Sequence, residues 1–422
     1  MNSSPKNPPD LDDNVSRMNN LLGALQYRDF RYYWFSALSF VLGWQILRMV
    51  LNWVGYELTN SAIYLGALGG AMALGTISVS LIGGVIADRI NRKILLINTQ
   101  TLMTISVGIL LWLSFLDLMN SWHLLVASLL IGIIQGIDMP TRSALIPALI
   151  PNKKYLMNGL ALGSAVWQGT RIFGPSLGGF LIKFIGSTSS FATVTITFFI
   201  GTILLVPLKI PRITRDTGNV IQELKNGLLF ISNNALFFNL ILLTFVDSFF
   251  GIAYMQLLPI FAKDILSVGP DGMGLLMGSS AAGGLIGTFT AAVVVQGRWP
   301  RLMLIGGAAF FGVFVLLFAI STNIWLSLTA LFLSGIFNSL TMITNQTILQ
   351  TAVPDELRGR VMGVFSLTYS LIPLGGLQVG ILADFLGAEI AVVIGSVVVI
   401  LFSLSLLVRR QFNEAVKNYA TV

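Results

Sequence analysis

The sequence predicts an all-α integral membrane protein with twelve membrane-spanning helices in two six-helix bundles. Of its 422 residues, 55% are hydrophobic and 10% are charged, whereas soluble domains carry about 25% charged residues. Apolar runs of about 20 residues recur along the chain, the length that crosses about 30 Å of hydrocarbon as a helix. Because backbone polar groups in lipid must be paired internally, and because no period-two alternation suggests a barrel, helices are the expected element.

The chain divides into two halves of six apolar segments each. We expect cytosolic tails at residues 1–29 and 409–422, an N-terminal bundle at 30–208, a cytosolic central loop at 209–234 and a C-terminal bundle at 235–408. In the central loop, apolar residues at helical spacing predict a short amphipathic helix at the membrane interface. The expected spans are 30–57, 61–87, 94–118, 122–149, 155–184, 188–208, 235–262, 271–296, 301–320, 324–351, 356–385 and 388–408.

The distribution of Lys and Arg predicts the orientation of the chain. Loops at one end of the spans are rich in cations, whereas the opposite loops hold only Lys183 and Lys263. By the positive-inside rule, the cation-rich loops and both termini face the cytosol, in a multi-pass protein of the cell membrane. The net charge of +7 is therefore explained by topology and indicates no nucleic-acid partner.

The halves also resemble each other in sequence. Gly66 and Gly70 of the second span correspond to Gly274 and Gly278 of the eighth, with an offset of roughly 200 residues. This repeat predicts two related bundles that meet around a central site.

A short polar loop follows the second span. Its residues are Gly84, Asp88, Arg89, Arg92 and Lys93. An acid at the C-terminal end of a helix opposes the helix dipole, so we expect Asp88 to be paired. The alternative is an ordinary cytosolic loop in which Asp88 is solvated.

This loop resembles the signature loop of major facilitator superfamily (MFS) transporters, with Asn91 where the family usually has glycine. The resemblance implies that Asp88 helps to latch the two halves at the cytosolic side. We expect Asn91 to adopt the left-handed turn in place of glycine. Asp138 either forms an ion pair with Arg142, four residues later on the same helix, or forms an ion pair with Arg92 as part of the latch.

A glycine motif lies in the fifth span. Gly174, Pro175, Gly178 and Gly179 resemble the fifth-helix motif of drug–proton antiporters, which is typical of exporters, and Ser176 and Leu177 are given no role. The alternative is generic close packing of small residues. Segments 27–31, 56–59, 138–142 and 354–363 are similar to the branch with the enterobactin exporter and macrolide efflux proteins, and the likeness covers about residues 27–408.

Ionisable side chains inside the spans are costly in lipid and are therefore functional candidates. One departure from the antiporters is Gly132, which stands where that group has an arginine linked to proton coupling. We expect Asp247 to carry the proton instead, the alternative being a structural, hydrogen-bonded carboxyl. The cavity candidates are Gln45, Arg48, Asn52, Arg171, Asp247, Asn338 and Gln346. The two arginines favour anionic or catechol-like solutes.

Enzyme chemistry is not expected. The chain has one histidine, His123, and no cysteine, and it lacks a GxxxxGK[ST] phosphate loop. We expect no cofactor and no metal. The resemblance implies a monomeric secondary active exporter of small amphipathic molecules such as drugs or siderophores, coupled to protons. The alternatives are an MFS importer of a nutrient and a non-transporting membrane partner of a secretion or biosynthesis complex.

Overall fold

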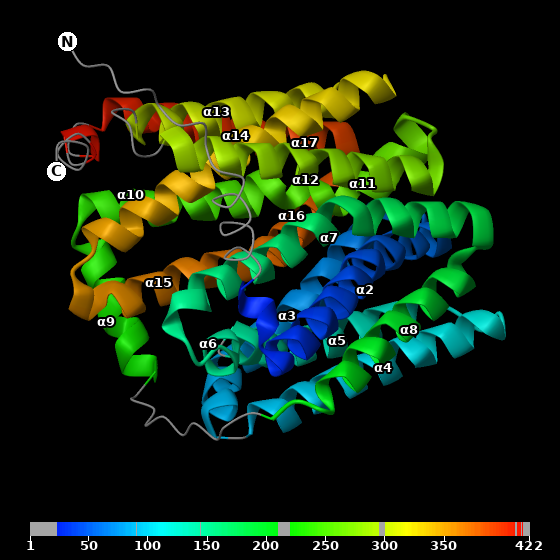
Figure 1. Cartoon of the computed structure of the whole chain (residues 1–422). Helices are drawn as coiled ribbons and strands as arrows, with labels where there is room; N and C mark the ends of the chain where they lie inside the picture. Colours follow the sequence, from blue (N-terminus) through cyan, green and yellow to red (C-terminus); the bar gives the residue numbers. More distant parts are fainter. Residues whose placement is uncertain are drawn as a thin grey trace, which may run out of the picture.

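The computed structural model describes residues 23–416 apart from 90, 144, 210–219, 295–299, 410, 411 and 415, with side chains left undescribed at 80–89, 220–224, 226, 292–294, 369 and 370. Every element in the described residues is a helix. The N-terminal half occupies the lower part of Figure 1 and the C-terminal half the upper part. Six long helices form the N-terminal half: α2 (Arg28–Thr59), α3 (Ala62–Arg89), α4 (Arg92–Phe115), α5 (Ser121–Ser143), α7 (Leu156–Ile185) and α8 (Ser187–Leu205).

The C-terminal half also has six spans, two of which are broken. The seventh span runs through α10 (Ala235–Val246), a π-helical turn η3 (Asp247–Gly251), a 3-10 turn η4 (Ile252–Leu257), α11 (Leu258–Ile260) and a second π-helical turn η5 (Phe261–Ile265). The eleventh span is interrupted between α15 (Asp355–Ser370) and α16 (Ile372–Leu386). The other spans are α12 (Gly269–Val294), α13 (Pro300–Ala319), α14 (Ile324–Ala352) and α17 (Ala388–Val408).

Each of the twelve predicted spans overlaps a long helix or a broken span, but the fourth, predicted for 122–149, is too long because α5 ends at Ser143. Within the described part of the chain, ten of them are long and apolar enough to cross a membrane. The two that fall short are α7 and α12, in which glycine and serine dilute the apolar residues. These two helices pack against each other across the boundary between the halves, so their lower hydropathy accompanies a protein-facing surface.

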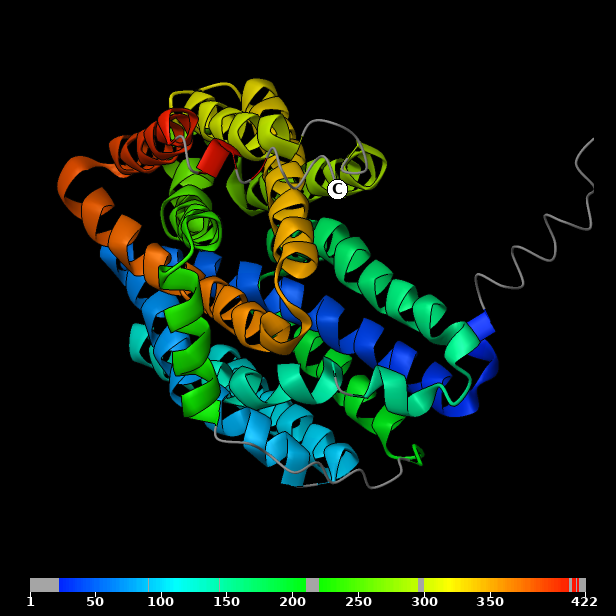
Figure 2. The ribbon, with the colours of Figure 1, turned by 90° about the vertical axis from the view of Figure 1, so that its left-hand side faces the viewer.

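Short elements connect the spans at one end of the bundle. They are η1 (Gly23–Gln26), α6 (Ile146–Leu149), η2 (Lys153–Tyr155) and α9 (Val220–Ser232). The last of these occupies the predicted amphipathic segment, buries Ile231 and packs against α15. Seen from the end at which α9 lies, the helices of the two halves form two groups, one below the other (Figure 2). This is the end that the positive-inside rule assigns to the cytosol, and we call the other end the outer end.

Two large hydrophobic core clusters lie in the halves, and one of them crosses the boundary between the halves. The first joins α2, α3, α4, α5, α7 and α8. The second joins the seventh span to α12, α13, α14, α16 and α17, and it also includes Met49 and Trp53 of α2 and Ala62 of α3. The halves therefore share buried apolar contacts in addition to their internal packing.

The repeat glycines of the sequence lie where the halves meet. A Cβ added at Gly66 would lie 3.1 Å from the carbonyl oxygen of Gly376 in α16. A Cβ added at Gly274 would lie 2.5 Å from the carbonyl oxygen of Pro175 in α7. The pairs α3–α16 and α12–α7 therefore make equivalent crossings in the two halves, each held close by glycine.

Candidate functional site

A pocket lies between α7 of the N-terminal half and four spans of the C-terminal half. Arg171 is the one lining residue from the N-terminal half. The opposite wall carries Ile252, Tyr254 and Met255 from η4, Ser280 and Gly284 from α12, Phe311 from α13, and Gly335, Asn338 and Ser339 from α14. A wall shared by both halves is where a solute must bind if the halves are to rock around it.

The broken seventh span shapes this pocket. Asp247 begins the π-helical turn η3, and η4 follows directly with Tyr254 turned inward. The hydroxyl groups of Tyr254 and Ser280 lie 3.2 Å apart in a hydrogen bond. π-helical turns inside longer helices frequently mark functional sites. The break therefore places polar groups of one span at the centre of an otherwise apolar bundle.

The carboxyl group of Asp247 is buried, with 7% of the residue exposed. Its Oδ2 accepts a hydrogen bond from Nδ2 of Asn338, which lines the pocket, at 2.7 Å. Its Oδ1 is buried and has no hydrogen-bond partner in the described structure. Two predicted cavity residues are thus brought together, and one carboxyl oxygen remains available for a proton or a ligand.

Arg48 and Arg171 approach from α2 and α7 of the N-terminal half. The two guanidinium groups lie near enough to repel each other, and Arg171 also lies within electrostatic range of Tyr254. Arg48 is partly buried and Arg171 is exposed, although both lie within membrane helices. Part of the surface of Arg171 is therefore not covered by other protein atoms.

The remaining cavity candidates lie elsewhere. Gln45 is buried against α7, because a Cβ added at Gly174 would lie 2.5 Å from its Cβ. Asn52 accepts a hydrogen bond of 2.9 Å from Gln256 of η4 at the boundary between the halves. Gln346 is partly buried on α14, outside the residues that line the pocket.

The glycine motif of α7 packs that helix on two sides. Gly174 and Gly178 face α2, whereas Gly179 faces α12, where an added Cβ would lie 2.3 Å from the carbonyl oxygen of Pro270. Ser176, to which the sequence assigns no role, donates a hydrogen bond of 3.2 Å to the carbonyl oxygen of Gly274. That expectation was wrong, because the small side chain of Ser176 reaches across the boundary that its glycine neighbours open.

Polar contacts join the halves at the outer end. Lys183 of α7 forms an ion pair of 2.7 Å with Asp271 of α12. Lys263 of η5 donates a 2.7 Å hydrogen bond to the side chain of Asn60.

Tyr56 of α2 adds a third contact at this end, because its hydroxyl donates to Asp264 of η5. Together with the glycine crossings, these contacts join the two halves at the outer end.

The signature loop is described only in part. Gly84, Asp88 and Arg89 belong to the last turns of α3, and their side chains lie outside the described residues, so the cytosolic latch stays a prediction. Arg92 and Lys93 begin α4. Asn91 departs from the expectation of a left-handed turn: its φ is −59°, and its side chain caps α4 by accepting from the backbone N–H of Lys93 at 3.0 Å. An asparagine at this position satisfies a free helix N–H, which glycine cannot do.

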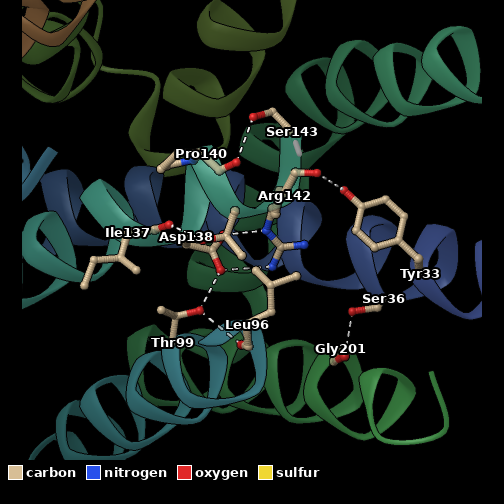
Figure 3. A network of polar contacts seen from close by, with 11 residues as sticks. Tyr33, Ser36, Leu96, Thr99, Ile137, Asp138, Pro140, Arg142, Ser143 and Gly201 are labelled. Atoms are coloured by element: carbon tan, nitrogen blue, oxygen red, sulfur yellow. Dashed lines mark hydrogen bonds and ion pairs between the residues drawn. The ribbon is translucent and has the colours of Figure 1, made fainter. Parts of the chain in front are cut away.

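Asp138 and Arg142 form a buried ion pair on α5, and the exposed fractions of their side chains are 1% and 6%. Oδ1 of Asp138 also accepts a 2.8 Å hydrogen bond from Thr99 of α4. The guanidinium carbon of Arg142 lies 4.1 Å from the ring centroid of Phe40. Figure 3 shows the pair between α4 and α2, with the hydroxyl of Tyr33 donating to the backbone oxygen of Arg142. The intrahelical pair is present, and it ties α5 to both neighbours.

Several residues of the site escape sequence reasoning. Ser280 and Ser339 line the pocket, and Gln256 bridges the halves by donating to Asn52 and to the backbone oxygen of Leu65. Serine and tyrosine are common in membrane helices. The one local signal was the cluster of Tyr254 and Gln256 in a segment whose helix breaks, and the break itself leaves no clear mark in the sequence.

Comparisons with known proteins identify the family of the chain. The family model of the Major Facilitator Superfamily matches residues 33–377 and 236–420. A staphyloferrin A transporter of Staphylococcus aureus is 26% identical over 85% of this chain and 90% of its own length. The multidrug efflux pump Tap of Mycolicibacterium fortuitum is 23% identical over 84% of this chain and 88% of its own length.

Solved structures share the fold. A bacterial homologue of the human lysosomal transporter Spinster, in an inward-facing conformation, superposes with a TM-score of 0.73 at 15% identity, covering 92% of this chain and 98% of its own. A bacterial homologue of the iron transporter ferroportin in an inward-facing state gives a TM-score of 0.69 at 18% identity. The match covers 89% of this chain and 98% of that homologue. With a family model that matches nearly the whole chain, and with two six-helix bundles around a shared pocket, this multi-pass membrane protein belongs to the major facilitator superfamily of transporters.

Proposed function

We propose that this transporter is a monomeric exporter of small amphipathic molecules, such as drugs or siderophores, that works by alternating access and proton antiport. The observation that carries the proposal is the pocket shared by the two halves, with Arg171 exposed in its lining and with polar contacts that join the halves at the outer end. In this arrangement a solute enters from the cytosol, and separation of α7 from α12 releases it outward.

The lining of the pocket supports an amphipathic solute. Ile252, Met255 and Phe311 provide apolar surface, whereas Ser280 and Asn338 provide hydrogen-bonding groups. Sites for small molecules combine a largely apolar wall with a few polar groups that fix orientation.

Asp247 supports the choice of the proton as coupling ion. Its carboxyl is buried beside the pocket, forms no ion pair in the described structure and has one oxygen without a partner. Protonation of an intramembrane carboxyl removes a charge that is costly to bury. In an antiport cycle, proton binding at Asp247 from outside would alternate with solute binding from the cytosol.

The direction of transport is supported by the glycine motif of α7 and by relatives that are named efflux pumps. The multidrug efflux pump homologue PmrA of Lactococcus lactis is 29% identical over 50% of this chain and 51% of its own length, in addition to Tap. In this structure the motif holds the crossing between α7 and α12, the contact that must open for release to the outside.

The test is dye export from energised cells of an efflux-deficient bacterium that expresses the chain. The probes are carboxyfluorescein, loaded as its ester, and rhodamine 123, which share a xanthene ring system. We expect the chain to lower the retained amount of at least one dye, and a protonophore or Asp247→Asn to abolish this effect. Asp384→Asn, an exposed carboxyl of α16, is the matched control that keeps export. Dye accumulation, or retention equal to that of cells without the chain, would overturn the proposal.

A further inference from the structure

We infer that the pocket takes an anionic solute, whose negative group binds Arg171 on the N-terminal wall, with Arg48 of the neighbouring helix α2 as a second cation. This inference rests on the proposed function and names its substrate class. Arg171 lines the pocket, and Arg48 lies on α2, which packs against α7 through Gly174 and Gly178.

Neither arginine has a carboxylate partner in the described part of the chain. The ion pairs found there join Arg142 to Asp138, Lys183 to Asp271 and Arg358 to Asp355. Two neighbouring cations without a counterion are unfavourable at the depth of a membrane bundle, where charges are usually paired. A mobile anion that binds both would supply the missing charge.

The opposite wall does not supply it. The carboxyl group of Asp247, which belongs to the seventh span, accepts a hydrogen bond from Asn338 of this wall at 2.7 Å. The pocket groups next to Arg171 on this wall are neutral. They include the hydroxyl groups of Tyr254 and Ser280, which form a hydrogen bond with each other. The charge of the pocket is therefore divided: the N-terminal half contributes cations, and the C-terminal half contributes neutral hydrogen-bonding groups and one protonatable carboxyl.

This division has a consequence for selectivity. Arginine binds carboxylate and phosphate groups through paired N–H donors, so an anionic group gains charge-assisted hydrogen bonds from Arg48 and Arg171. An organic cation of the same size meets two like charges with no counterion. The apolar residues of η4 and α13 then contact the body of the solute.

The experiment is equilibrium binding to the purified full chain in detergent micelles, measured by fluorescence anisotropy. The probes are again carboxyfluorescein, which is anionic, and rhodamine 123, which is cationic on a similar ring system. We expect the anionic dye to bind, and Arg171→Gln or Arg48→Gln to weaken its binding by about tenfold or more. Arg171→Lys should recover part of that loss because it keeps the positive charge.

Arg301→Gln is the matched control, since Arg301 is exposed at the start of α13 and outside the pocket. It should leave binding unchanged. Tighter binding of rhodamine 123, no binding of carboxyfluorescein, or equal binding by the arginine variants would overturn the inference. Arginine-dependent binding in a protein that exports neither dye would contradict the proposed function alone, whereas proton-dependent export of rhodamine 123 only would contradict the anionic assignment alone.

Discussion

The crossing of α7 and α12 at Gly179 yields a quantitative prediction for Gly179→Ala. The added Cβ would lie 2.3 Å from the carbonyl oxygen of Pro270 and 2.9 Å from Cα of Asp271, both backbone atoms of the other half. No rotation of a side chain relieves this overlap, so the helices must separate by about 1 Å or the halves must part. Overpacking of this kind costs about 1–3 kcal/mol.

That cost applies to the outward-closed state alone, because the contact is lost when α7 and α12 separate. The equilibrium between the two states should therefore shift toward outer opening by about 5- to 150-fold, at about 1.4 kcal/mol for each factor of ten. Alanine also favours the helix over glycine by about 1 kcal/mol, but this gain is common to both states. The fold of each bundle should be retained.

The assay is the distance between two spin labels at the outer end. The chain has no cysteine, so Asn120→Cys and Glu389→Cys, both exposed, give specific sites without removal of native residues. Gly179→Ala should increase the population of long distances between the labels. Gly169→Ala on the same helix is the control, because its added Cβ meets nothing within 4 Å. A distance distribution equal to that of the unsubstituted pair would refute the reasoning.

Two further predictions concern buried polar contacts. Asp138→Ala should destabilise the protein by about 3–5 kcal/mol because it leaves the buried cation of Arg142 unpaired. The loss should appear as a lower midpoint of thermal unfolding. The control is Asp355→Ala, at an exposed ion pair of α15, which should cost less than about 1 kcal/mol. Gln256→Ala removes hydrogen bonds between the halves worth about 0.5–1.5 kcal/mol each and should favour outer opening several-fold in the spin-label assay. Gln350→Ala, exposed on α14, should leave that distribution unchanged, and equal behaviour of the two glutamine variants would contradict the role of Gln256.

Sequence reasoning could reach the spans because hydropathy and helix length are local properties. The repeat glycines could be identified as well, since a close crossing of membrane helices requires small residues wherever it occurs. Asp247 and Asn338 were recognisable as costly polar groups within apolar segments, and the structure brings them together. Arg48 and Arg171 were recognisable for the same reason.

What the sequence alone determined is the lipid environment, the number of spans and the duplicated six-helix plan, because each of these follows from composition and spacing within a short stretch. Only the tertiary structure decided which polar residues share the pocket, that Gln256 and Ser176 bridge the halves, and that ion pairs and hydrogen bonds join the halves at the outer end. Those features depend on the rotation of each helix about its axis and on the break at Asp247. Both are set by packing between residues about 100–200 positions apart, which no local pattern records.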